Sequence, residues 1–321
     1  MNLLGPEART LEVHPVPFTC LLHRYPSSGH REWDRLGIPL LLAAVGDAAQ
    51  LGYTSLHVAG DEPLHCPALH SLCDEAHRHG MKTTLQLGQG VLNQRLLEEL
   101  QGSVDLLGIV LESRPAAQGR VRKCRHLRTA RQLGMETAVI MKLTRGNMND
   151  LEWAAQFAAE HEASTLSIRP YRVSDEQITT AWMVVEFLRD VCRGRLRIGF
   201  DSPNRYCLPA DITELNLWQR GLSACPQTLG DIVSPLVIDT RGMVFPLRAS
   251  LPQEFALGAL GGHSLRELAE HWISYGSAAF AECYANALLR ARSEMDAFND
   301  FFDLLSEEAG RSRGAALAAA G

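Results

Sequence analysis

Short apolar runs alternate along the chain with longer segments in which apolar residues recur at helical spacing. The runs predict strands over residues 11–14, 55–59, 82–86, 106–111, 136–143, 165–170 and 197–201. The segments between them predict helices over 40–51, 67–79, 93–100, 121–133, 151–161 and 176–192. This alternation is typical of βαβ units around a parallel sheet, in which ligands bind beyond the carboxyl ends of the strands.

Three predicted helices end at a glycine that is followed directly by a predicted strand. The glycines are Gly52, Gly80 and Gly134, in the sequences QLGY, RHGM and QLGM. Glycine is favoured at this position because the chain turns there through a left-handed conformation. The three glycines therefore predict where the helices stop.

The last third of the chain predicts a different organisation. Residues 236–238 and 243–245 predict a hairpin that turns at DTRG, and residues 264–308 predict helices. The final segment is rich in small residues and is expected to fray. We therefore expect a barrel over 1–205, a small domain with C-terminal helices over 206–308, and a flexible tail over 309–321.

Composition narrows the classes of partner. The chain has 321 residues, 46% of them hydrophobic, and a net charge of −6, which gives no general attraction to nucleic acid or to anionic membranes. No apolar run is long enough to span a membrane, and the N-terminus lacks the layout of a secretory signal. The eight cysteines are scattered rather than paired. These features predict a cytoplasmic protein with reduced thiols and without nucleic-acid or membrane partners.

The loop GDEP, formed by Gly60, Asp61, Glu62 and Pro63, resembles the GGEP loop of the radical-SAM superfamily. The similarity continues through DLLGIVLES and GMETAVIMKL. The late block ACPQTLGDIVSPLVIDTRGMVFPL is similar to the SPASM or Twitch appendage of that superfamily. The resemblance covers about residues 11–283. It implies an α/β fold: a partial (β/α)6 TIM-like barrel with a small C-terminal SPASM/Twitch-like appendage and a helical tail.

The resemblance also implies two cofactors, a [4Fe–4S] cluster and S-adenosylmethionine. The family holds the cluster through a CxxxCxxC loop after the first strand. In this chain the three positions are Cys20, Arg24 and Ser27, within FTCLLHRYPSSG. Iron–sulfur clusters depend on thiolate ligands, and neither a guanidinium nor a hydroxyl replaces one. We therefore expect that the cluster does not assemble.

Other implied cofactor contacts also depart from the family. Asp61 replaces the second glycine of GGEP, the TNG triplet becomes Leu87, Gly88 and Gln89, and the SLDG segment becomes residues 110–113. In the appendage Leu247 replaces the cysteine of the PC dipeptide, which leaves Cys225 and Cys283 as remnants of an auxiliary cluster site. The resemblance implies a pocket like that for S-adenosylmethionine, lined by Gly60, Asp61, Glu62, Pro63, Gln89, Glu112, Asn149 and Arg169.

Metal binding without a cluster is a further alternative. Cys20 and His23 form a C-x-x-H pair that suits zinc if His30, His57 or Cys66 adds a third ligand; otherwise they are a free thiol and a surface histidine. Cys66, His70, Cys73 and His77 share one stripe of a predicted helix, as metal ligands or as packing residues.

Three other features have two interpretations each. The segment 114–131 carries many arginines and suits either an acidic partner or a solvated helix face. Glu62 is a candidate proton carrier or a residue that holds its loop by hydrogen bonds. Asn147 and Asn149 suit a turn and a helix cap as well as ligand contacts.

Two main hypotheses follow. The first is a pseudoenzyme or accessory protein that binds a peptide, a nucleoside-like ligand or a partner enzyme in peptide (RiPP) or cofactor maturation. The second is an active radical-SAM enzyme with unconventional cluster ligation that modifies a peptide or a small metabolite. A third is a metal-independent lyase or hydrolase that uses Glu62 or Asp61 with a barrel histidine such as His57.

Overall fold

A computed structural model of the chain describes residues 9–13, 37–59, 64, 66, 68–87, 94–111, 117–170, 175–200, 228–248, 251–293 and 301–320. Seven of its strands are parallel neighbours in chain order. They are β1 (Thr10–Val13), β2 (Ser55–Val58), β3 (Lys82–Leu87), β4 (Leu106–Leu111), β5 (Glu136–Leu143), β6 (Thr165–Pro170) and β7 (Arg197–Phe200).

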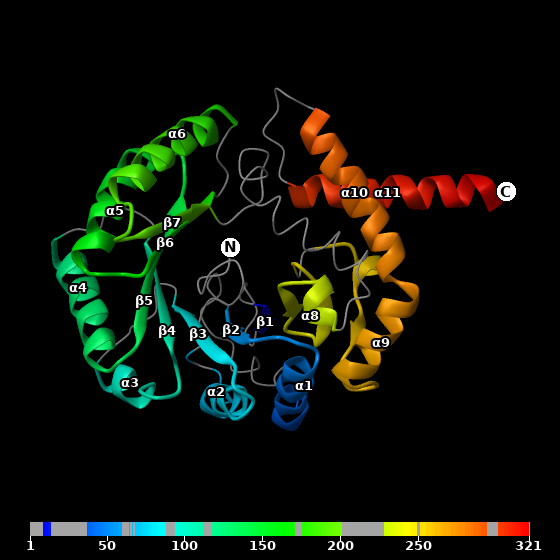
Figure 1. The fold of residues 1–321 in the computed structure, drawn as a ribbon, viewed down its shortest axis with the longest axis horizontal. Helices are drawn as coiled ribbons and strands as arrows, with labels where there is room; N and C mark the ends of the chain where they lie inside the picture. Colours follow the sequence, from blue (N-terminus) through cyan, green and yellow to red (C-terminus); the bar gives the residue numbers. More distant parts are fainter. Residues whose placement is uncertain are drawn as a thin grey trace, which may run out of the picture.

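Helices connect these strands and cover one face of the sheet. They are α1 (Ile38–Gln50), α2 (Leu69–Arg78), α3 (Gln94–Glu99), α4 (Ala117–Gln132), α5 (Leu151–Glu160) and α6 (Asp175–Val191). The strands follow an arc, and these helices lie along its outer side (Figure 1). The predicted alternation of strands and helices around a parallel sheet is therefore confirmed.

No described helix combines the length and the apolar character that a membrane span requires.

The sheet is open rather than a closed barrel. Its order is β10-β9-β8-β1-β2-β3-β4-β5-β6-β7, and no ladder joins the end strands β7 and β10 within the described part of the chain. The described part of the chain is therefore a curved, mixed sheet, and the partial barrel that the resemblance implies stays a prediction.

The predicted hairpin exists and extends the same sheet. It consists of β8 (Leu236–Ile238) and β9 (Met243–Pro246), which are antiparallel, and β10 (Gly258–Ala259) pairs with β9. β8 also pairs with β1 in parallel, with Leu11 opposite Leu236. The N-terminal strand therefore lies between β2 and a strand from the last third of the chain.

A tight contact beside β8 joins the segment after α1 to the segment before β8. The short helix α8 (Leu229–Ile232) begins with a capping box between Thr228 and Asp231. The backbone N–H of Gly230 donates to the carbonyl of Leu51 at 2.8 Å. The buried hydroxyl of Tyr53 donates to the carbonyl of Val233 at 2.8 Å, and burial raises the pKa of that phenol.

The C-terminal helices pack through aromatic side chains. α9 (Leu265–Tyr275) begins at Ser264 with a capping box to Glu267, and α10 (Ser277–Ser293) and α11 (Phe301–Ala320) follow. Phe280 on α10 is fully buried. α11 includes most of the segment that we expected to be flexible, and its flexibility stays a prediction. The alanines of this segment favour a helix, because alanine has the highest helix propensity.

The glycines that were predicted to end helices do so with positive φ. After α5, a non-glycine residue takes the same left-handed conformation. Gly52, Gly80 and Gly134 have φ of 90°, 74° and 86°, whereas Glu162 takes this conformation after α5 with φ of 52°. We expect Gly134→Ala to reduce the free energy of unfolding by about 1 kcal/mol. A Cβ there meets no atom within 4 Å, so the cost is one of backbone conformation.

Glu162→Gly is the matched opposite substitution. We expect it to raise the free energy of unfolding by about 0.5–1 kcal/mol in urea denaturation. The ion pair of Glu162 with Arg131 is largely exposed and contributes little. A loss of stability in the Glu162→Gly protein would contradict the assignment of backbone strain.

Candidate functional site

The inner face of the parallel sheet is separate from the face that packs on the helices. Leu107, Ile109 and Leu111 of β4 belong to the main core beneath the helices. The alternate positions, Leu106 and Val110, join Ala138 and Ile140 of β5 in a small second cluster. Because side chains alternate across a strand, the second cluster marks the inner face.

Polar and charged residues occupy much of this inner face. By the same alternation, Glu12, His57, Gln86, Lys142 and Arg169 lie on it, one from each of β1, β2, β3, β5 and β6. The interior of a packed (β/α) barrel is dominated by branched apolar side chains. A polar inner face therefore suits ligand binding rather than packing. We call these five residues the inner-face set.

Glu12 and His57 face each other on neighbouring strands. The register places Glu12 opposite His57, and the carboxylate Oε2 lies 3.5 Å from Nδ1 of the imidazole. Only 12% of the His57 side chain is exposed. Nε2 is buried and has no hydrogen-bond partner within the described residues. A buried polar atom without a partner is rare in folded proteins. We therefore take Nε2 as an indication that a further polar group binds there.

Arg169 and Gln86 contact each other across the sheet. Arg169 Nη1 donates to Gln86 Oε1 at 2.5 Å, although β4 and β5 separate the two strands. In a flat sheet three strand spacings place β3 and β6 about 14 Å apart. The contact therefore shows that the sheet curves strongly toward its inner face. It also places Arg169, a residue that the resemblance implied for a cofactor pocket, on that face.

Most of the predicted site residues lie outside the described residues. They are Cys20, His23, Arg24, Ser27 and His30 of the first loop, Gly60, Asp61, Glu62 and Pro63 of GDEP, and Gln89, Glu112 and Cys225. Their proposed roles stay predictions.

The two asparagines after β5 are described. Asn147 accepts from the backbone N–H of Thr144 at 2.7 Å and donates to the carbonyl of Lys142 at 2.8 Å. Asn147 is therefore the turn residue that one of its two interpretations predicts. Asn149 lies exposed in the 3-10 helix Met148–Asp150. Its predicted contact with a cofactor stays a prediction.

Cys66 and Cys73 are buried thiols that favour the protonated form. Burial raises the pKa of the Cys66 thiol to about 11 and that of the Cys73 thiol to about 12, which disfavours the thiolate that a metal requires. Cys283 is buried in α10, and Leu247 occupies the position after Pro246 with φ of 62°. Within the residues that the structure describes, no group of three or more histidine, cysteine and acidic side chains is placed to hold a metal ion.

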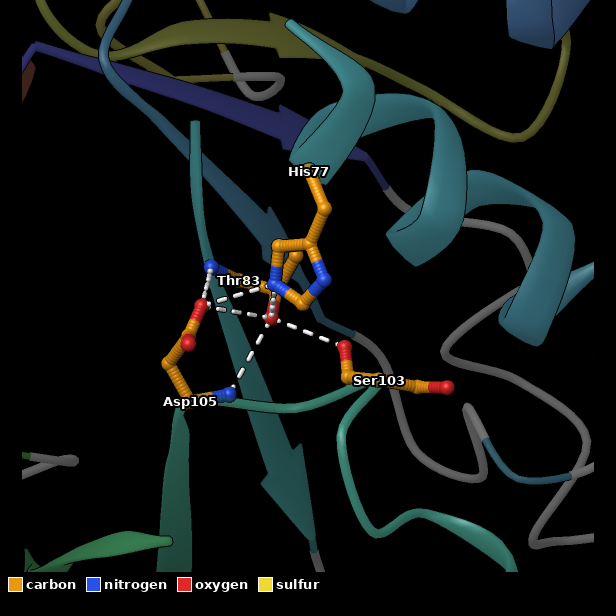
Figure 2. A network of polar contacts seen from close by, with 4 residues as sticks. All are labelled: His77, Thr83, Ser103 and Asp105. Atoms are coloured by element: carbon orange, nitrogen blue, oxygen red, sulfur yellow. Dashed lines mark hydrogen bonds and ion pairs between the residues drawn. The ribbon is translucent and has the colours of Figure 1, made fainter. Parts of the chain in front are cut away.

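His77 belongs instead to a polar network at the amino-terminal edge of the sheet. Figure 2 shows His77 of α2 beside Thr83, Ser103 and Asp105. His77 Nε2 lies 3.0 Å from Asp105 Oδ2, and Asp105 also accepts from the backbone N–H of Thr83 at 2.6 Å. His70 contacts the Ser103 hydroxyl at 3.3 Å. These contacts favour a packing role for the stripe of cysteines and histidines.

Stability is expected to depend on the charge of Asp105. Burial opposes its charge, but hydrogen bonds from the Thr83 backbone, the His77 ring and the Thr83 hydroxyl hold the pKa of Asp105 below its ordinary value. The charged form therefore stabilises the fold above pH ~4, and this contribution is lost as pH falls through the lowered pKa. We expect Asp105→Asn to cost about 1 kcal/mol at pH 7, because the side chain is half exposed.

Urea denaturation at pH 7 and in acid measures this difference. The difference in free energy of unfolding between the wild type and Asp105→Asn should become smaller as pH falls. Asp190→Asn should change the free energy of unfolding little at either pH. Asp190 pairs with Arg193, and both side chains are largely exposed to solvent. A gap that stays constant with pH would show that the carboxylate charge is not the source of the stabilisation.

The basic segment on α4 is in part tied to the fold. The Lys123 ammonium donates to the carbonyl of Val110 at 2.7 Å, and Arg131 pairs with Glu162. Arg125 and Arg128 are exposed. The segment therefore combines structural contacts with a solvated helix face, and docking of an acidic partner stays a prediction.

Comparison with solved structures identifies the fold. The enzyme SuiB of Streptococcus suis with bound S-adenosylmethionine is similar to 81% of this chain, with a TM-score of 0.55 and 12% identity. SuiB bound to its precursor peptide SuiA gives a TM-score of 0.53 over 74% of the chain, also at 12% identity. The matches cover 63% and 58% of the SuiB chain, so this chain spans less than two thirds of SuiB.

A second enzyme matches over nearly its whole length. The structure of anSMEcpe with bound AdoMet gives a TM-score of 0.54 and 12% identity, over 93% of this chain and 95% of that one. No protein-family model and no curated protein sequence matches the chain. Both structural neighbours are radical-SAM enzymes. The chain therefore has a fold similar to that of radical-SAM enzymes.

Proposed function

We propose that this chain is a relative of the radical-SAM enzymes that binds a ligand on the inner face of its sheet but does not assemble their iron–sulfur cluster. It would act as a binding or accessory protein in peptide or cofactor maturation. The polar inner-face set carries the proposal, because charged side chains there favour a bound ligand over a packed interior.

At the three positions of the family's cluster loop, the donor atoms of this chain do not fit a [4Fe–4S] cluster. Of the three positions that match the family's cluster loop, only Cys20 is a cysteine, and Arg24 and Ser27 supply a cation and a neutral hydroxyl. The buried thiols of Cys66 and Cys73 have raised pKa values and do not compensate. Since three thiolates hold such a cluster in the family, one is insufficient, and no step of the proposed function passes through it.

The structural neighbours support two classes of ligand. SuiB has been solved with S-adenosylmethionine and with a precursor peptide, and anSMEcpe with AdoMet. A peptide and a nucleoside-like ligand are therefore the classes that we propose for this chain. Glu62 and Arg169 are candidate contacts of the second class, and a partner enzyme in the same pathway is a further candidate.

Anaerobic reconstitution with iron and sulfide tests the proposal. We expect the desalted wild-type protein to retain no more iron and sulfide per chain than Cys20→Ala, to lack the visible thiolate-to-iron absorption, and to leave S-adenosylmethionine intact after reduction. About four irons per chain with reductive cleavage would contradict the proposal.

That opposite result would establish the second candidate, an active radical-SAM enzyme with unconventional ligation. The similarity of the whole scaffold to working enzymes favours this candidate. If a cluster forms, loss of iron in Cys20→Ala would identify Cys20 as a ligand.

A further inference from the structure

The inner-face set contains an acid–base pair, Glu12 and His57. Ligand binding alone does not explain why these two side chains lie together. Glu12 and His57 are adjacent, largely buried, and part of the face on which we propose that the ligand binds. We propose that they form a proton-transfer pair, and that the ligand is a small carboxylate with an enolisable carbonyl. This inference rests on the proposed binding at the inner face and adds a chemistry that requires neither iron nor a radical.

The position of Glu12 beside Nδ1 favours one tautomer of the His57 ring. When Nδ1 carries the hydrogen, it donates toward Glu12 Oε2, 3.5 Å away, and the lone pair is then on Nε2. This distance is long for a hydrogen bond, and such contacts commonly shorten when a substrate binds. Nε2 is buried and has no partner within the part of the chain that the structure describes. His57 is therefore arranged as a base and Glu12 as its positioning residue.

Gln86 supplies a hydrogen-bond donor next to His57. His57 lies opposite Thr84, so Gln86, two residues farther along β3, is its diagonal neighbour on the same face. The oxygen of the Gln86 amide accepts from Arg169, which orients the NH2 group as the donor side of the amide. A base and a neutral donor side by side suit a carbonyl whose α-hydrogen faces the base.

Positive charge on the same face indicates that the proposed ligand carries an anionic group. Lys142 lies opposite Arg169 in the register of β5 and β6. Two neighbouring cations favour an anionic group over a neutral or cationic one. A carboxylate placed toward Arg169 and a carbonyl placed at Gln86 describe a 2-oxo acid.

The step is a balanced proton transfer. Neutral His57 takes the α-hydrogen of the ligand as a proton on Nε2. The electrons of the broken C–H bond form the C=C bond of the enolate, and the carbonyl π-electrons move to the oxygen beside Gln86. The imidazolium is stabilised by Glu12, exchanges its proton with solvent, and returns a proton to carbon, so no oxidant or reductant is needed.

Deuterium exchange tests this inference with defined probes. The full chain is incubated in D2O with pyruvate or 2-oxobutyrate, and loss of the α-hydrogens is followed by proton NMR. We expect exchange above the buffer rate and at least a 100-fold reduction in His57→Gln. His70→Gln is the matched control and should retain the wild-type rate, because His70 lies on α2, away from the inner face. Exchange no faster than buffer with both probes would overturn the inference.

The role of Glu12 has a separate spectroscopic readout. In protein with 15N-labelled histidine, the nitrogen shifts of His57 should show the Nδ1–H tautomer, and Glu12→Ala should move the population toward Nε2–H. An unchanged tautomer would overturn the positioning role. Because the exchange assay contains no iron, its failure is distinguishable from failure of the proposed function, which the iron content and cleavage of S-adenosylmethionine decide.

Discussion

Gly230→Ala is expected to lower the free energy of unfolding by about 2–3 kcal/mol. A Cβ at Gly230 would lie 2.9 Å from the carbonyl carbon of Gly52 and 3.0 Å from the backbone oxygens of Gly52 and Leu51. All three atoms belong to the backbone, so no rotation of a side chain relieves the clash. The bond from Gly230 N–H to Leu51 would also be disturbed.

Gly310→Ala is the matched control, since it makes the same change in another helix. No atom lies within 4 Å of a Cβ at Gly310. Alanine should therefore stabilise α11 there by about 0.5–1 kcal/mol. In urea denaturation, the free energy of unfolding should fall for Gly230→Ala and rise for Gly310→Ala. Equal effects would show that the approach of α8 to the turn after α1 is not tight in solution.

Phe280→Ala is expected to cost about 3–5 kcal/mol, because it removes a fully buried ring and leaves a cavity. The Phe280 ring centroid lies 5.0 Å from that of Phe255, 5.7 Å from Trp272 and 6.0 Å from Tyr284. The substitution therefore removes contacts between α10, α9 and the segment before β10.

Leu289→Ala in the same helix should change stability by less than about 0.5 kcal/mol, because this side chain is 62% exposed. Thermal and urea unfolding should be followed by both tryptophan fluorescence and circular dichroism. If Phe280→Ala unfolds only the C-terminal helices and leaves a separate transition for the sheet, the aromatic cluster is not coupled to the rest of the molecule.

The parallel sheet was predictable because its signals are local. The strands β4, β5 and β6 were predicted with the bounds that the structure shows, since each has closely spaced or alternating apolar residues. The ends of α1, α2 and α4 follow from the glycines after them. The pairing of β8 with β1 was not predictable in this way, because it joins Leu11 to Leu236 and depends on tertiary packing.

The candidate site was also predictable only where its signals are local. Alternation in TLEV and SLHV places Glu12 and His57 each on one face of its strand, but only the register brings the two together. His57 was predicted as a candidate site residue, whereas Glu12 was not. The available signal for Glu12 was its position as one charged residue between buried neighbours. The contact of Arg169 with Gln86 depends on curvature of the sheet, which no local pattern encodes.

The central position of β1 has a consequence for synthesis of the protein. One side of β1 pairs with β2, which emerges from the ribosome soon afterwards, but the other side waits for β8. Until about residue 238 has been made, the growing polypeptide exposes an unpaired strand edge, a surface prone to self-association. A fragment ending near residue 205 would keep that edge permanently, so we expect it to aggregate and the two halves to require coexpression.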